Sequence, residues 1–477
     1  MTSEPVGIVV LGGGLAGNMV TQALATHLGT SVRITQLVDG PGPVGDVLYG
    51  SATAPDAYNF LRHLGLDEPT LILKSRTSFS FGTHFRTWPD TGGWLQAHHA
   101  PLALIDGIPM RHVIARTGTL LEPLLISAQA ALAGRFAHPP ADPASPLSHA
   151  EYGYQFAVDD WTRLLEAEVA TGTARRLTAS VEAVETGEDG IIALRLETGE
   201  RLAADLIIDA SGVSRTGLSS LGGQFRTERT VGIYPTEATC DRTGPPCRVI
   251  EASERGWSVR AHLQDHDRIL SIGAPETATG TDSGFVAALG RVERAWVGNC
   301  VAIGHAACVT EPLTPAPMML LQRDIERLLE LIPVGPDMSV ERREFNRRFA
   351  ADADHAALFQ RALLVGRRDA GGAYWQAAAT LDRPEKLDRK IRQFCHRGTL
   401  VAYDLEPFND EDWTILHLGM GRWPKQHDRQ VDRLTAATAD RELTVIRDSV
   451  ARMTQQMPPH DIYLTKLKQY LDRKRNA

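Results

Sequence analysis

A glycine-rich turn near the start of the chain constrains its fold more than any other feature. The apolar run Val6–Leu11 leads into Gly12-Gly13-Gly14-Leu15-Ala16-Gly17, a G-x-G-x-x-G pattern, and residues 18–28 carry apolar side chains at helical spacing. In such turns the first glycine permits the tight bend, the second lets the backbone approach a pyrophosphate, and the third lets the helix pack on the strand. The segment predicts a dinucleotide-binding turn with contacts from Gly12, Gly14, Ala16 and Gly17.

An acidic residue stands at the expected distance from this turn. Residues 32–38 form a second apolar, β-branched stretch, and Asp39 follows it. In dinucleotide-binding folds an acid about 20 residues after the turn hydrogen-bonds a ribose hydroxyl. We expect Asp39 to do so. The alternative is a glycine turn with a purely structural role, because the glycine pattern alone is a weak signal.

Composition limits the class of protein. The chain has 477 residues, a net charge of −8 and 43% hydrophobic residues, which is enough for a large core and two closely joined parts. The negative charge argues against a nucleic-acid partner. No run of 18 apolar residues indicates a membrane span. The first predicted strand leaves no room for a signal peptide, so a cytoplasmic location is expected.

Cysteine and histidine usage indicates neither disulfides nor a metal site. The five cysteines lie apart, without zinc-ligand spacing, and their number is odd, which favours reduced thiols. The sixteen histidines form no H-E-x-x-H pattern, so no metal is expected. Lysine is rare, and Lys74 is the only lysine before Lys386.

The pattern beyond the glycine turn mixes strands and helices and becomes mostly helical after residue 340. Phe79, Phe81 and Phe85 stand at odd positions, which is strand periodicity, and residues 187–190 form a hairpin signal between 179–185 and 191–197. Pro235 suggests an edge position for its strand. Further strands are expected at 204–208, 230–238, 256–263, 269–274 and 295–303, and helices at 57–64, 159–171 and 317–332.

Six motifs occur in order along nearly the whole chain. They lie at Gly12–Gly17, Gly50–Gly65, Tyr152–Phe156, Asp205–Gly212, Gly304–Leu313 and Gly419–Pro424. They are similar, respectively, to G-G-G-x-A-G, G-E-A-T-x-P with F-L-x-x-L-G, Y-x-Y-H-F, D-L-F-I-D-A-S-G, G-[ND]-A-A-G-F-x-E-P-L and G-M-G-x-x-P. This series resembles the flavin-dependent tryptophan halogenase family.

The resemblance implies an α/β fold. A Rossmann-like FAD-binding domain would be interwoven with a mixed β-sheet substrate domain and a largely helical C-terminal part. We expect the FAD-binding domain over 1–335, with the β-sheet substrate region inserted at about 77–120 and 225–275. Residues 336–477 would form the helical region that covers the substrate.

The resemblance also implies FAD as cofactor, reduced by a separate flavin reductase, and O2 as co-substrate. The positions that match the family's other flavin-contacting turns are Ser51, Ala52, Asp209, Gly304 and His305. Family chemistry uses reduced FAD, O2 and chloride to make hypochlorous acid. A buried lysine and a glutamate then direct this oxidant onto an aromatic ring.

Two departures concern the residues that handle the halogen. Ser80 stands at the lysine position of A-T-F-K-x-G, and a serine has no amine. Residues 311–317 match the halide loop E-P-L-x-S-T-G but end in Pro315-Ala316-Pro317, and Pro317 has no N–H to donate. Lys74 lies six residues before Ser80, about 20 Å along a strand, and is expected at the surface. Glu311 is retained, as a structural helix-start acid or as an acid–base group. We predict Glu311 and Ser80 at the catalytic site.

The resemblance and these departures together predict a FAD-dependent monooxygenase of secondary metabolism. It would act on an aromatic or indole-like small molecule, free or carrier-bound, without halogenation. Two alternatives stay open: a true halogenase with a rearranged site, and a non-catalytic flavin-fold binding protein. Expected partners are the substrate and a transiently bound flavin reductase. Nucleic acid and membranes are not expected, and a homodimer is left open beside a monomer.

Overall fold

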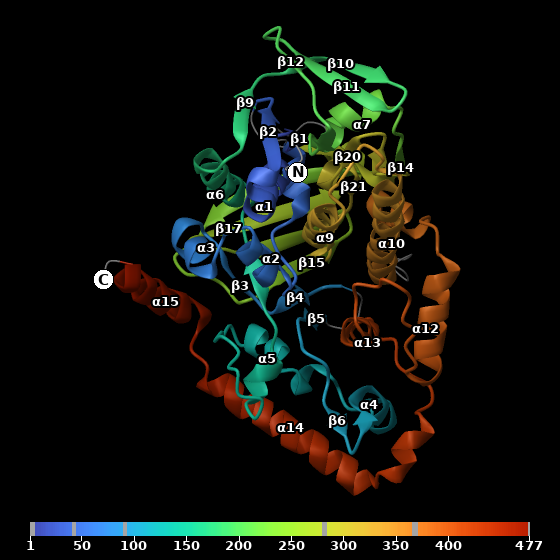
Figure 1. Cartoon of the computed structure of the whole chain (residues 1–477). Helices are drawn as coiled ribbons and strands as arrows, with labels where there is room; N and C mark the ends of the chain where they lie inside the picture. Colours follow the sequence, from blue (N-terminus) through green and yellow to red (C-terminus); the bar gives the residue numbers. More distant parts are fainter. Residues whose placement is uncertain (1–4, 41–43, 89–92, 279–283, 365–370, 476–477) are drawn as a thin grey trace.

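The computed structural model describes residues 5–40, 44–88, 93–278, 284–364 and 371–475. A six-stranded sheet with the order β19–β20–β13–β1–β2–β9 forms its first layer (Figure 1). These strands are β1 (Val6–Leu11), β2 (Val32–Val38), β9 (Arg175–Thr178), β13 (Leu206–Asp209), β19 (Trp296–Val297) and β20 (Cys300–Ala302). β1 pairs in parallel with β2 and β13, and β13 pairs in parallel with β20. The carboxyl ends of these four strands therefore share one edge, where parallel α/β sheets bind ligands.

Helices packed on this sheet follow the predicted pattern. α1 (Leu15–Leu28) contacts β2, α6 (Val158–Thr171) and α9 (Ala316–Glu330). The helices predicted at 57–64, 159–171 and 317–332 are confirmed as α2 (Ala57–His63), α6 and α9. The apolar side chains of α1, including Leu15, Met19 and Leu24, are buried.

An eight-stranded, mostly antiparallel sheet forms the second layer. Its order is β21–β18–β14–β17–β16–β15–β4–β5. The strands are β4 (Gly82–Phe85), β5 (Trp94–Ala97), β14 (Phe225–Thr239), β15 (Arg248–Ser253), β16 (Gly256–His262), β17 (His266–Gly273), β18 (Phe285–Val292) and β21 (Cys308–Val309). The sheet thus joins a segment near residue 90 to segments beyond residue 225, and the predicted α/β class is confirmed.

Three details of the predicted strands differ in the structure. Pro235 lies on an interior strand, because β14 pairs with both β17 and β18, and among the described residues the β18 pairing ends at Ile233. The strand predicted at 295–303 is broken at Gly298 (φ 56°) into β19 and β20. The stretch 77–88 divides at Gly82 (φ 145°) into β3 (Ser78–Ser80) and β4. β3 pairs with β8 (Gly153–Gln155), outside the eight-stranded sheet.

Smaller elements complete the fold. The predicted hairpin is confirmed as β10 (Val181–Gly187) and β11 (Gly190–Leu196), extended by β12 (Arg201–Leu202). β6 (Leu104–Ile105) pairs with β7 (Ile108–Pro109). The remaining helices of the first part are α3 (Glu68–Lys74), α4 (Met110–Thr117), α5 (Ile126–Leu132), α7 (Thr216–Ser220) and α8 (Pro275–Ala278). Short 3₁₀ segments include η2 (Val44–Tyr49), η3 (Glu122–Leu124), η4 (Pro146–His149) and η6 (Gly304–Ala306).

The last third of the chain is helical, as predicted, and it closes back onto earlier segments. It contains α10 (Ser339–Leu364), α11 (Gly372–Ala379), α12 (Glu385–Arg397), α13 (Asp410–Gly419), α14 (Ala436–Gln456) and α15 (His460–Arg475). α14 crosses α4 and α5, and α15 reaches α3 (Figure 1). We call residues 457–468 the C-terminal clasp. Within it, the His460 N–H donates to Gly134 O at 2.9 Å, and Lys468 Nζ donates to Gln264 Oε1 at 2.7 Å.

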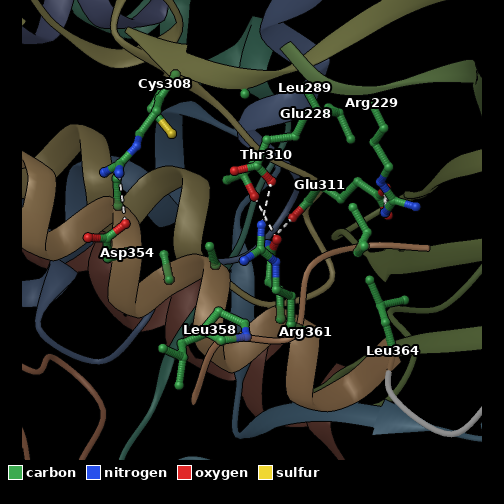
Figure 2. A pocket seen from close by; sticks show the side chains of 18 of the residues that line it. Glu228, Arg229, Leu289, Cys308, Thr310, Glu311, Asp354, Leu358, Arg361 and Leu364 are labelled. Atoms are coloured by element: carbon green, nitrogen blue, oxygen red, sulfur yellow. Dashed lines mark hydrogen bonds and ion pairs between the residues drawn. The ribbon is translucent and has the colours of Figure 1, made fainter. Parts of the chain in front are cut away.

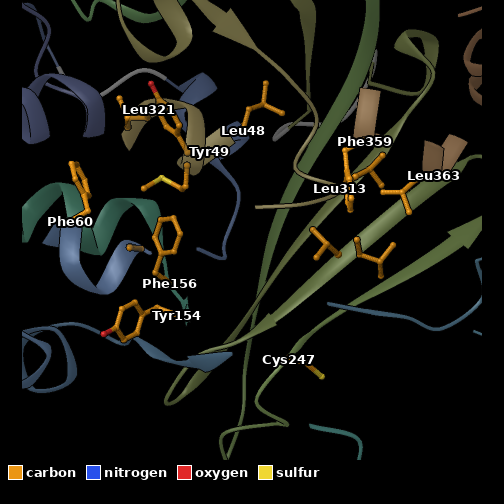
Figure 3. Close-up of a cluster of buried hydrophobic side chains, with 14 of the residues drawn as sticks. Leu48, Tyr49, Phe60, Tyr154, Phe156, Cys247, Leu313, Leu321, Phe359 and Leu363 are labelled. Atoms are coloured by element: carbon orange, nitrogen blue, oxygen red, sulfur yellow. The ribbon is translucent and has the colours of Figure 1, made fainter. Parts of the chain in front are cut away.

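One continuous hydrophobic core links the two sheets and the helices. Tyr49, Phe60 and Phe156 belong to this core near the six-stranded sheet, and Leu313 and Phe359 belong to it near α10 (Figure 3). In the described part of the chain no helix is long and apolar enough to cross a bilayer, and no group of acids, cysteines and histidines could hold a metal ion. All five cysteines, which lie in described segments, are unpaired.

Candidate functional site

The glycine turn has the shape that a dinucleotide needs. Gly12 has φ 120°, and a Cβ on it would lie 2.4 Å from Ala210 O. A Cβ on Gly17 would lie 2.1 Å from Gly12 O, so only glycine lets α1 approach β1 this closely. Gly14 is the N-cap residue of α1, and Ala16 lies in its first turn. The predicted turn is therefore present, with the first N–H groups of α1 at its mouth.

The predicted ribose-binding acid lies at the same edge of the sheet. Asp39 follows β2 directly and is exposed. Its Oδ1 accepts a hydrogen bond from Ser180 Oγ at 2.7 Å. Buried Gln36 donates to Gly12 O at 3.0 Å and to Asn18 Oδ1 at 2.9 Å, which fixes the turn from beneath. Turn and acid together suit a nucleotide's phosphates and ribose.

The second and third predicted turns converge on the first. Asp209 is buried, and its carboxylate accepts the N–H groups of Ser211, Gly217 and Leu218 at 3.1, 2.9 and 2.8 Å, so its side chain shapes its own turn. Gly304 has φ 57°, and a Cβ there would lie 3.2 Å from that of Ala16. The structure thus brings the residues predicted from three distant motifs to one place.

The sequence did not predict one residue whose carboxylate contacts the first turn of α1. Asp46 on η2 is 8% exposed, and its Oδ2 accepts the Leu15 N–H at 2.9 Å. Burial raises the pKa of Asp46 to about 6, and the Leu15 hydrogen bond offsets part of this rise. The stretch around residue 45 reads as a glycine- and proline-rich loop, and no motif there pointed to this contact.

His305 and Tyr49 form a stacked pair beside Asp46. Their ring centroids are 3.7 Å apart at an interplanar angle of 6°. The backbone N–H of His305 donates to Tyr49 Oη at 3.0 Å. His305 Nδ1 lies 3.9 Å from Asp46 Oδ1. Burial and the Arg215 charge lower the pKa of His305 to about 3, so the ring is neutral. Its buried Nε2 has no hydrogen-bond partner among the described residues.

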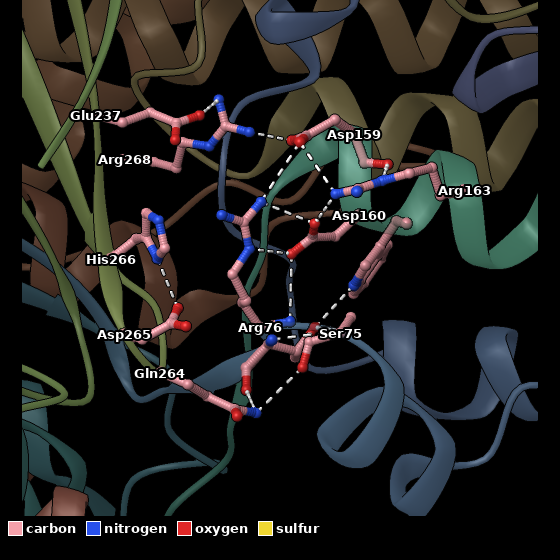
Figure 4. A network of polar contacts seen from close by, with 12 residues as sticks. Ser75, Arg76, Asp159, Asp160, Arg163, Glu237, Gln264, Asp265, His266 and Arg268 are labelled. Carbon is pink, nitrogen blue, oxygen red and sulfur yellow. Dashed lines mark hydrogen bonds and ion pairs between the residues drawn. The ribbon is translucent and has the colours of Figure 1, made fainter. Parts of the chain in front are cut away.

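A cavity of about 590 Å³ opens beside Asp46, between η2, α6 and strands β14 and β17. We call it the Asp46 pocket. Ser51 lines it, and the neighbouring Ala52 bridges to Gln155. Charged side chains at its far wall are paired with one another: Arg268 contacts Asp159 and Glu237, and Arg163 contacts Asp159 and Asp160 (Figure 4).

Glu311 is buried within a network of donors. It is 1% exposed and forms an ion pair with Arg229. Its Oε2 accepts hydrogen bonds from Trp257 Nε1 at 3.0 Å and from Tyr374 Oη at 2.7 Å. Burial lowers the pKa of Arg229, but the Glu311 charge outweighs this, so that pKa is raised. Glu311 and Arg229 also line a cavity of about 360 Å³ between β14, β21 and α10 (Figure 2).

Ser80 and Glu311 lie on separate elements, and a buried arginine connects the strand that follows Ser80 to the loop that follows Glu311. Ser80 is fully buried, and its hydroxyl donates to Gly82 O at 3.1 Å. Arg248, also 0% exposed, donates to Thr83 Oγ1 at 2.8 Å, to Pro312 O at 2.7 Å and to Leu313 O at 2.7 Å. Burial lowers the pKa of Arg248 to about 9. Arg248 therefore ties β4 to the loop after Glu311, and no sequence motif indicated it.

The fold and the glycine turn define an α/β protein in which a mostly parallel sheet packs with a large, mostly antiparallel sheet. The family model described as tryptophan halogenase matches residues 7–268 and 274–436. The chain belongs to the tryptophan halogenase family.

Individual relatives are distant but match along their full length. The tryptophan 6-halogenase SttH of Streptomyces toxytricini is 23% identical over 98% of this chain and 99% of its own. Among solved structures, the flavin-dependent halogenase BrvH of Brevundimonas sp. BAL3 has a TM-score of 0.88 and 24% identity, over 98% of this chain and 100% of its own. The flavin-dependent halogenase Xcc4156 of Xanthomonas campestris has a TM-score of 0.87 and 24% identity, over 97% and 98%. At these identities the structural likeness establishes the fold.

Proposed function

We propose that the protein is a FAD-dependent monooxygenase that uses reduced FAD and O2 on an aromatic or indole-like small molecule, without halogenating it. Family membership supports FAD, and a separate flavin reductase would reduce it. When bound, reduced FAD would supply the electrons that activate O2. The proposed FAD contacts are Gly12, Gly14, Ala16, Gly17, Asp39, Ser51, Ala52, Gly304 and His305, with Asp209 shaping the second turn.

The observation that carries the absence of halogenation is Ser80. Its hydroxyl is buried and bonded to Gly82 O, so no amine stands at this position to hold a hypohalous acid. Lys74 does not replace it, because this side chain is 53% exposed and points to Glu168 at 3.8 Å. The halide loop supports the same conclusion: Ala316 N donates to Thr314 Oγ1 at 3.3 Å, and Pro317 offers no N–H.

A halogenase with a rearranged site is the second candidate, since the named relatives are halogenases. One buried lysine favours it. Lys390 on α12 is 2% exposed and lies 4.4 Å from the centre of the Trp413 ring. Its ammonium is already held by Glu406 at 2.9 Å and by Val401 O, which is the arrangement of a structural buried pair.

Mass spectrometry of reaction products separates the two candidates. Purified protein, flavin reductase, NADH, FAD and O2 are incubated with tryptophan and a panel of indoles, with and without chloride or bromide. We expect a product that has gained oxygen and whose yield is independent of halide. A halogenated product that disappears in Lys390→Met and persists in the exposed control Lys74→Met would overturn the proposal in favour of a halogenase.

A further inference from the structure

The first turn of α1 already holds an anion, and this anion belongs to the protein itself. Asp46 Oδ2 accepts the Leu15 N–H at 2.9 Å. The N–H groups at the start of a helix have no partner within it, and the helix dipole favours negative charge there. Phosphates bind at such ends for the same reason. A cofactor pyrophosphate and the Asp46 carboxylate would therefore seek the same donor.

The other end of η2 contacts the third turn. Tyr49 Oη accepts the His305 N–H at 3.0 Å, and the two rings stack. A Cβ on Gly304 would lie 2.3 Å from Tyr49 Oη, so the phenol fits against this turn only because residue 304 is glycine. The orphaned, buried Nε2 of His305 is an independent sign that a polar group belongs here. One short segment thus touches both turns that would hold the cofactor.

Asp46 has space into which it can move. Val44, Asp46 and Val47 all line the Asp46 pocket, a cavity of about 590 Å³. Displacement from Leu15 would exchange one buried backbone hydrogen bond for solvation in the pocket. Because the net contribution of one such hydrogen bond is small, binding of a pyrophosphate can drive the exchange.

We propose that Asp46 is a built-in competitor for the cofactor's pyrophosphate. In the cofactor-free protein it caps α1, and on FAD binding it moves into the Asp46 pocket. FAD would then be held loosely enough to exchange, as an enzyme supplied with reduced FAD by a separate reductase requires. The identity of the ligand rests on the proposed function; the competition itself rests on the geometry of Asp46, Leu15 and His305.

Burial raises the pKa of both Asp46 and Asp324 to about 6, and Asp324 accepts the Gly304 N–H at 3.0 Å. His305 on η6 has a pKa lowered to about 3, and the pKa of Tyr49 is raised by burial and by Asp46 itself, so both stay neutral. The charged groups across the Asp46 pocket are held in ion pairs: Asp159, Arg163, Glu166, Glu237 and Arg268.

Equilibrium titration with two flavins tests the competition. FAD and riboflavin are titrated into the wild-type protein, Asp46→Asn, Asp46→Ala and the control Glu166→Gln by flavin fluorescence between about pH 5 and 8. Glu166 lines the same pocket but pairs with Arg176. At pH 8 both Asp46 variants should bind FAD about 10-fold or more tightly than wild type, a gain of about 1.4 kcal/mol. Riboflavin, which has no phosphate, should bind all four proteins alike.

The outcomes distinguish the two proposals. Asp46 variants that bind FAD no more tightly than wild type and Glu166→Gln would overturn the competition while leaving FAD as the cofactor. Equal tightening of FAD and riboflavin would also overturn it, because the effect would not involve the phosphates. The proposed function itself would be overturned if neither the wild-type protein nor any variant bound FAD. Circular dichroism spectra equal to that of the wild type would show that these proteins are folded. FAD binding that is tighter in both Asp46 variants than in wild type and Glu166→Gln, with riboflavin binding unchanged, would support the competition.

Discussion

Replacing Glu311 by Gln should destabilise the fold, because the buried guanidinium of Arg229 would lose its ion-pair partner. Glu311 and Arg229 form an ion pair in which the two side chains are 1% and 11% exposed. Removing one partner of a buried pair costs about 3–5 kcal/mol, since the other charge is left without compensation. For a chain of 477 residues, the entropy of unfolding near 60 °C is about 1 kcal/mol per kelvin. The thermal midpoint of Glu311→Gln should fall by about 3–5 °C.

A double-mutant cycle measures the pair itself. Thermal unfolding is followed by calorimetry for wild type, Glu311→Gln, Arg229→Gln and the double variant, with Glu442→Gln as control. Glu442 pairs with Arg441 at the surface, where a single ion pair contributes about 0–1 kcal/mol. The double variant should recover part of the loss, because no lone charge remains. A midpoint for Glu311→Gln equal to that of the control would refute the buried-pair interpretation and favour a carboxylate free for catalysis.

Three further perturbations address other parts of the site. Gly17→Ala would place a Cβ 2.1 Å from Gly12 O, so FAD binding should be lost in a fluorescence titration; unchanged affinity would contradict the assignment of this turn. Arg248→Met removes three buried hydrogen bonds and should lower the free energy of unfolding in urea by about 3 kcal/mol or more, whereas a loss below about 1 kcal/mol would show that the arginine is dispensable. Burial raises the pKa of Asp46 to about 6, so the free energy of unfolding of wild type, compared with that of Asp46→Asn, should be greatest below about pH 4. This difference should fall by about 3 kcal/mol by about pH 7. A difference that does not change with pH would contradict the raised pKa.

The sequence predicted those parts of the site that local geometry determines. The glycine turn could be recognised because strand, turn and helix follow one another within 23 residues, Val6 to Leu28. The glycine turn is a short-range pattern with a direct physical cause. The family resemblance implied the Asp209 and Gly304 turns, and the structure places them at the same sheet edge as the glycine turn.

Long-range contacts were beyond reach of the sequence. Asp46 meets Leu15 across 31 positions, and Arg248 meets Thr83 across 165. Neither residue belongs to a recurring spacing, so no periodicity could indicate it. The strand pattern of Phe79, Phe81 and Phe85 covers two strands, β3 and β4, for a related reason. Its alternating phenylalanines are all buried, but Gly82 lies so close to β5 that a Cβ on it would be 2.2 Å from Gln96 O, and this approach divides the stretch between two sheets.

The C-terminal clasp has a consequence for biosynthesis. Lys468 bonds to Gln264, whose amide donates to the carbonyls of Ile72, Ser75 and Thr77, just before the strand of Ser80. About 400 residues separate Thr77 from Lys468, and a ribosome needs about 20–80 s to add them. Until α15 emerges, this corner of the protein lacks its cover, and its apolar side chains are open to chaperones and to aggregation. Expression at reduced temperature or with extra chaperone should therefore improve the yield of the full-length protein.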